Sequence, residues 1–145
     1  MSLADWLNEG HLRTHKSSKN EINQLLSVFA RDIADAQSPS ISIDRRFTTA
    51  YNAALTLCIV ALAASGYRAA GEGHHYWAIQ SLSLTLQLDA DTIEKFNKFR
   101  RKRNISDYER SGAISTSELT EMLELATHLR VRTEDWLRQY HPELL

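Results

Sequence analysis

The sequence predicts an all-α protein, a four-to-five-helix up-and-down bundle that forms a single domain over residues 1–145. Apolar residues recur at steps of three and four along most of the chain, and no segment shows the strict alternation of a half-buried strand. Five glycines and two prolines are few for 145 residues, which favours long helices with short joints. A chain of this length can bury about 68–70% of its unfolded surface, enough for one core.

The first third of the chain predicts a short amphipathic turn and one helix. Leu3, Trp6 and Leu7 give the turn, which closes near Gly10. Apolar residues then share one helical face over residues 22–33. We expect this helix to end before Ser38-Pro39, because the residue before a proline avoids the α region.

Residues 47–70 predict a helix that is apolar on almost every side. Ser42 or Asp44 is placed to cap it, and residues 71–73, Gly-Glu-Gly, break it. Such a helix belongs in the middle of a bundle or at a subunit interface. Its many alanines favour the helical state and permit close approach of a neighbour.

The second half predicts three more helices. One covers residues 74–86, and the next begins at Asp89 or Asp91. Ser115 and Glu118 match a capping box, in which each side chain bonds the backbone N–H of the other residue. We expect the helix that follows to continue through Trp136 to Tyr140.

Composition narrows the classes of function. The formal net charge of −1 gives no global attraction to nucleic acid or membranes, so a polyanion site must be local. Cys58 is the single cysteine, so no disulfide forms within the chain and a reducing compartment is expected. Because Cys58 lies in the apolar helix, we expect it to be a small core residue rather than a nucleophile. The N-terminus has no signal-peptide pattern, and the longest apolar run, residues 53–64, is shorter than the roughly 18–20 residues of a membrane span. We therefore expect a cytoplasmic protein without a membrane segment, a metal or a cofactor.

The most distinctive stretch is KFRRKRNISDY, residues 98–108. Residues 95–110 carry seven basic and two acidic side chains, a net charge of +5, which leaves −6 for the rest of the chain. Phe96, Phe99 and Arg103 share one helical face, whereas the other basic side chains reach water. Arg103 therefore faces a cleft or an interface, or it pairs with Asp107 at the helix end.

This segment also resembles the characteristic segment of HEPN domains. The similarity rests on RRKRNISDY in a late helix of an all-α chain, and it extends to other stretches of the sequence: WLNEGHL, RDIADAQ, FTTAYNAALTLCIVALAASGYR and GHHYWAIQSL. Among these, the Arg103-Asn104 element is the specific one.

The resemblance implies a helical bundle that forms a homodimer and brings two Arg…His motifs together in a cleft. Active members of the family cleave RNA without a metal, and many are encoded beside a nucleotidyltransferase in toxin–antitoxin pairs. Arg103 matches the motif arginine and Asn104 the polar residue after it. Tyr108 stands where the histidine is expected, and His128 is too distant to replace it.

This departure has a chemical consequence. Metal-free RNA cleavage needs a base near neutrality, a role that suits histidine, whereas the tyrosine pKa of about 10 makes it a poor base. An arginine still holds a phosphate by charge-assisted hydrogen bonds. The candidate catalytic residues are Arg103 and Tyr108, and the candidate nucleic-acid-binding residues are Arg100, Arg101, Lys102, Arg103 and Asn104.

Three hypotheses follow. The first is a HEPN-like dimer that binds RNA or a nucleotide with weakened catalysis, in a toxin–antitoxin or defence module. The second is an active, metal-independent endoribonuclease in which Tyr108 or a histidine from elsewhere, His74 or His75, moves protons. The third is a structural interaction module whose basic segment stabilises a helix end. His11 and His15 have metal-ligand spacing, but no third ligand lies near them in the sequence.

Overall fold

Most residues of this structure, a computed structural model, are in helices. The structure describes residues 1–108 and 112–145, together with their side chains except those of residues 105–108. The α-helices within this part are α1 (Leu3–Asn8), α2 (Lys19–Ala36), α3 (Ile43–Ala64), α4 (His74–Gln80), α5 (Ala90–Tyr108) and α6 (Thr116–Tyr140). Two 3₁₀ turns, η1 (Ser81–Ser83) and η2 (Pro142–Leu144), follow α4 and α6. The all-α prediction is confirmed.

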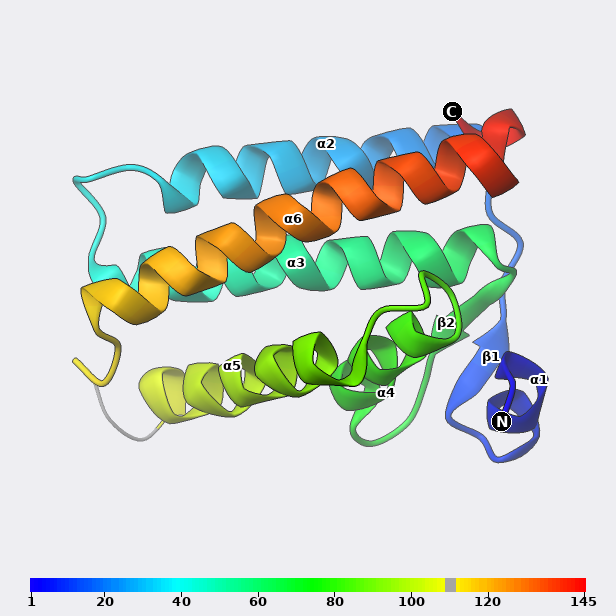
Figure 1. The fold of residues 1–145 in the computed structure, drawn as a ribbon, viewed down its shortest axis with the longest axis horizontal. Helices are drawn as coiled ribbons and strands as arrows, with labels where there is room; N and C mark the ends of the chain where they lie inside the picture. The colour runs from blue at the N-terminus through cyan, green and yellow to red at the C-terminus, as the bar shows by residue number, and fades with distance from the viewer. Residues whose placement is uncertain (109–111) are drawn as a thin grey trace.

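The four long helices run alternately in opposite directions along the molecule (Figure 1). Helix α3 lies in the centre, with α2 and α6 packed on one side and α4 and α5 on the other (Figure 1). Its side chains supply much of the hydrophobic core, including the fully buried Phe47, Tyr51 and Leu57. The central position predicted for this apolar helix is therefore confirmed.

Helix α3 is long and apolar enough to span a membrane by length and composition alone. It is longer than the apolar run at residues 53–64, because the helix begins at Ile43. The bundle, however, buries 72% of its most apolar window. The hydrophobicity of α3 thus matches its place in the core.

Several predicted helix ends are confirmed by their hydrogen bonds. The Ser42 hydroxyl accepts from the Arg45 N–H at 3.3 Å at the start of α3. At the start of α6, the Ser115 N–H donates to Glu118 Oε1 at 2.9 Å, and the Glu118 N–H donates to Ser115 Oγ at 3.1 Å. The Asp89 carboxylate accepts the Thr92 N–H at 3.0 Å immediately before α5. These local contacts follow directly from residue order.

The prediction that no strand is present is wrong. Strands β1 (Leu12–Thr14) and β2 (Tyr67–Ala69) form a two-stranded antiparallel sheet in which Leu12 lies opposite Ala69. Each strand has three residues, too few for alternation to show in the sequence. Strand β2 also shortens the helix predicted to reach residue 70, because Gly66 adopts a φ of +95° that ends α3.

The helix predicted over residues 74–86 is also too long, since α4 ends at Gln80. The Ser81 hydroxyl donates to the Ala78 carbonyl at 2.6 Å, and the Thr85 hydroxyl donates to the Ser81 carbonyl at 3.2 Å. Such side-chain bonds satisfy carbonyls while the backbone leaves the helix. Gln87 then takes a φ of +55°, which turns the chain toward α5.

Candidate nucleic-acid interface

Helix α5 divides the basic run between two sides of the molecule. Lys98 and Arg101 are exposed, and Arg101 Nη2 lies 3.0 Å from the Glu94 carboxylate. Lys102 reaches Glu118 on α6, with an N–O distance of 3.3 Å. The groove on this side, of about 520 Å³, is lined by four acidic residues beside its lysines: Asp91, Glu94, Glu118 and Glu121. These carboxylates make that groove unsuitable for a polyanion.

Arg103 turns toward the other side, against α3. Its side chain is half-buried, and its Cζ lies 5.7 Å from the ring centroid of Tyr51, in cation–π range. Its Nη1 lies 3.4 Å from the Oδ1 of the exposed Asn104. The predicted face is confirmed, because Phe96 and Phe99 on the same stripe are buried. The alternative pair with Asp107 involves a side chain outside the described residues.

Arg100, one turn before Arg103, lies on the α4 side of the same helix. Its Cζ is 5.6 Å from the ring centroid of Tyr76, the third residue of α4. Its Nε is 3.4 Å from the Oδ1 of the buried Asn97. Arg100 thus makes its polar contact with a neutral amide rather than a carboxylate, so its charge is available to an anion.

His75, at the start of α4, lies beside the arginines. Its half-buried ring is 6.3 Å from the Tyr51 ring and 4.5 Å from the His74 ring, measured between centroids. Burial lowers the pKa of His75 below its ordinary value of 6.5. The charges of His74, Arg103 and Arg100 lower this pKa further. His75 is therefore neutral near neutral pH and has a ring nitrogen that accepts a hydrogen bond.

Tyr51 of α3 lies next to both Arg103 and His75. Its side chain is fully buried, and its hydroxyl has no hydrogen-bond partner among the described residues. Burial raises the pKa of Tyr51, and Cys58 adds to the increase, while Arg103 and Arg100 oppose it. The phenol is thus uncharged and presents its ring to Arg103. Tyr51 belongs to the apolar helix predicted over residues 47–70, and nothing in the residue order indicates its place under Arg103.

A small apolar pocket of about 220 Å³ opens next to His75. Its wall consists of aliphatic side chains from α3 and α4, with charged or polar groups from β2 and α4: Leu55, Ile59, Leu62, Ala78, Ala69, Arg68, His74 and His75. Ile59, one of the aliphatic members, is exposed over 42% of its surface. His75 therefore lines an apolar pocket and also lies close enough to Arg100 and Arg103 to feel their charges.

The remaining predicted site residues are distributed as follows. The Tyr108 side chain lies outside the described residues, so its proposed role stays a prediction. His128 is exposed on α6. His11 stacks on Trp77 with ring centroids 3.6 Å apart, and His15 pairs with Glu21 at 2.8 Å. Across residues 1–108 and 112–145, no cluster of three or more histidine, cysteine or acidic side chains is arranged to hold a metal.

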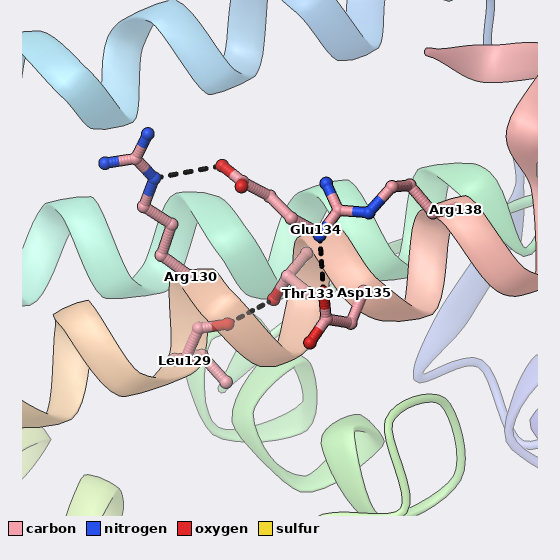
Figure 2. Close-up of polar contacts among 6 residues, drawn as sticks. All are labelled: Leu129, Arg130, Thr133, Glu134, Asp135 and Arg138. Carbon is pink, nitrogen blue, oxygen red and sulfur yellow. Dashed lines mark hydrogen bonds and ion pairs between the residues drawn. The ribbon is translucent and has the colours of Figure 1, made fainter.

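A wider cavity of about 600 Å³ lies at the C-terminal half of α6, beside residues 84–87. Arg132, one of its lining residues, donates to the Leu86 carbonyl at 2.9 Å. Asp135, another, is bound by Arg138 one turn along α6 (Figure 2). The charged groups at this cavity thus already have partners within the fold.

No protein-family model, curated protein or solved structure matches this chain. The functional argument therefore rests on the residues and on their geometry.

Proposed function

We propose that this protein is a HEPN-like helical bundle that binds RNA or a nucleotide through a basic cleft around Arg103-Asn104. In this proposal the cleft lies at the interface of a homodimer, and the protein belongs to a cytoplasmic toxin–antitoxin or defence module with a nucleotidyltransferase partner. The HEPN assignment rests on the sequence resemblance, in which Arg103 and Asn104 match the family motif.

One observation carries the binding proposal. The guanidinium groups of Arg100 and Arg103 lie on the side of α5 that faces α3 and α4, over the rings of Tyr76 and Tyr51. Guanidinium forks suit the bidentate recognition of phosphate, and the exposed ring of Tyr76 offers a surface on which a base stacks. Arg101 and Lys102, which pair with Glu94 and Glu118 on the other side of α5, contribute to the long-range attraction of the basic segment.

Binding without cleavage is the expected outcome, since Tyr108 occupies the position of the motif histidine. A second candidate function, a metal-independent endoribonuclease, is favoured by the neutral His75 beside Arg103. Incubation of a generic RNA with a chelator distinguishes the two functions. Cleavage products that disappear in His75→Gln would support the nuclease.

The first test is the affinity of Arg103→Gln for a fluorescent single-stranded RNA, measured by anisotropy over a series of salt concentrations. We expect about a tenfold or larger loss of affinity and a shallower salt dependence, because a charge-assisted phosphate contact contributes about 1.5–3 kcal/mol. Wild-type binding should weaken steeply as salt increases.

Arg130→Gln is the matched control. It removes the same charge from α6, where Arg130 bonds Glu134 at 2.9 Å and extends towards α2 (Figure 2). It should bind RNA like the wild type. Equal losses in Arg103→Gln and Arg130→Gln would reject the site, and wild-type protein that binds neither RNA nor nucleotide would leave the structural module as the function.

A further inference from the structure

We propose that Arg100, Arg103 and His75, together with the apolar pocket beside them, form within a single chain a site for a terminal phosphate monoester carried on a nucleoside. The ligand is a mononucleotide or the 5′-phosphorylated end of an RNA. This inference rests on the proposed binding of RNA or a nucleotide and is independent of the proposed homodimer. It makes the binding function more specific, since it names the phosphate class and assigns the binding groups to one chain.

Three donors lie over or beside the rings of Tyr51 and Tyr76. Arg103 and His75 both approach the fully buried ring of Tyr51, at 5.7 Å and 6.3 Å from its centroid. Arg100 lies over Tyr76, the residue next to His75. The donors come from two helices, α4 and α5, and Tyr51 comes from a third helix, α3. No partner subunit is needed to complete this set.

The charge of these three groups favours a phosphate monoester over a diester. Two guanidinium groups and an imidazole that gains a proton present up to three positive charges to the ligand. A phosphate monoester carries about −1.5 to −2 near neutral pH, whereas a diester linkage carries −1. The monoester therefore gains more from this site.

The apolar pocket of about 220 Å³ lies next to His75. Its lining is mainly aliphatic, from Leu55, Ile59 and Leu62. Ligand pockets in proteins combine an apolar wall with a few polar groups, and this volume accommodates a single ring system. A phosphate at the arginines and a base in the pocket place His75 between them, next to the sugar.

His75 then links binding to protonation. The groups that face it are Tyr51 from α3, His74 from α4 and the two arginines of α5, and Arg68 of β2 lines the same pocket. The cations among them disfavour the imidazolium in the free protein. A bound dianion offsets this repulsion, so the pKa of His75 rises on binding and affinity increases as pH falls toward about 6, where the phosphate itself begins to take up a proton.

The test uses the full-length protein and three probes: adenosine 5′-monophosphate, a short RNA with a 5′-phosphate, and the same RNA with a 5′-hydroxyl. Calorimetry should give one mononucleotide per chain, and the phosphorylated RNA should bind about tenfold or more tightly than its hydroxyl counterpart, equivalent to about 1.4 kcal/mol. NMR titration of the histidine rings should show the His75 pKa rising when the mononucleotide binds.

The variants separate the site from general electrostatics. His75→Gln and Arg100→Gln should remove the preference for the 5′-phosphate. His128→Gln, which changes an exposed histidine on α6, should retain it.

Equal binding of the two RNAs would overturn this inference and leave the proposed RNA-binding function standing. A stoichiometry of one mononucleotide per two chains would overturn the single-chain site. Failure of all three probes to bind would reject the inference and the proposed function together. Mononucleotide binding that depends on His75, without RNA binding, would support the site and restrict its ligand to free nucleotides.

Discussion

At the residue scale, the candidate site is an arrangement of charge over a buried aromatic ring. Arg103 covers the Tyr51 ring and so shields part of its guanidinium from water, where a cation interacts more strongly with anions and with π-electrons. Arg100, also half-buried, lies over Tyr76, whose side chain is 36% exposed. In the proposed site, Arg103 orients a bound anion and Arg100 attracts it from solution.

His75 makes folding stability depend on pH. Its pKa is lowered in the folded state from an ordinary value of 6.5, so the unfolded chain takes up a proton first as pH falls. We expect the free energy of unfolding to decrease below about pH 6.5, and the decrease to be smaller in His75→Gln. Urea unfolding near pH 7 and near pH 5 measures this difference. His128→Gln should keep the wild-type dependence, and an unchanged slope in His75→Gln would contradict the assignment.

At the element scale, contacts on both sides of α5 determine the directions in which its basic residues point. The phenylalanines Phe96 and Phe99 anchor it to α3 through edge-on contacts with Tyr51 and Phe47. Lys102 reaches across to α6 and bonds Glu118, which is also the capping residue of that helix. The start of α6 therefore helps to fix the rotation of α5, and with it the direction in which Arg103 points.

The capping box at the start of α6 should contribute measurably to stability. Ser115→Ala removes the acceptor of the Glu118 N–H, and we expect the free energy of unfolding to fall by about 1 kcal/mol. Chemical denaturation measures the change. Ser117→Ala, an exposed first-turn position of α6, should change stability by less than about 0.5 kcal/mol. Similar losses in the two variants would show that the box does not stabilise the helix end.

At the scale of the whole molecule, the central position of α3 in the bundle accounts for its hydrophobicity. Helix α3 contacts α2 and α6 on one side and α4 and α5 on the other, so its apolar surface is used within one chain. An apolar helix of this kind is therefore no longer an argument for a subunit interface. The proposed homodimer rests on the family resemblance alone.

Sedimentation over a range of protein concentrations tests the homodimer. We expect a species with twice the mass of the chain that dissociates on dilution, by mass action. A monomer whose mass is independent of concentration would reject the dimer while leaving the single-chain site intact.

Local patterns predicted much of this fold. The all-α class, the caps at Ser42 and Ser115 and the central place of the apolar helix predicted over residues 47–70 follow from contacts within one helical turn or from uniform hydrophobicity. The sheet between β1 and β2 and the early end of α4 were missed. Each depends on pairing between distant segments or on side-chain bonds that compete with the helix.

By itself, the sequence determined that Arg103 shares a face with Phe96 and Phe99, because a helix repeats every 3.6 residues whatever surrounds it. Only the tertiary structure decided what that face meets. Tyr51 and His75 lie on other helices, and packing around α3 brings them to the arginine. Periodicity fixes direction within a helix, whereas the burial of apolar surface between helices selects the neighbours, and the candidate site consists of those neighbours.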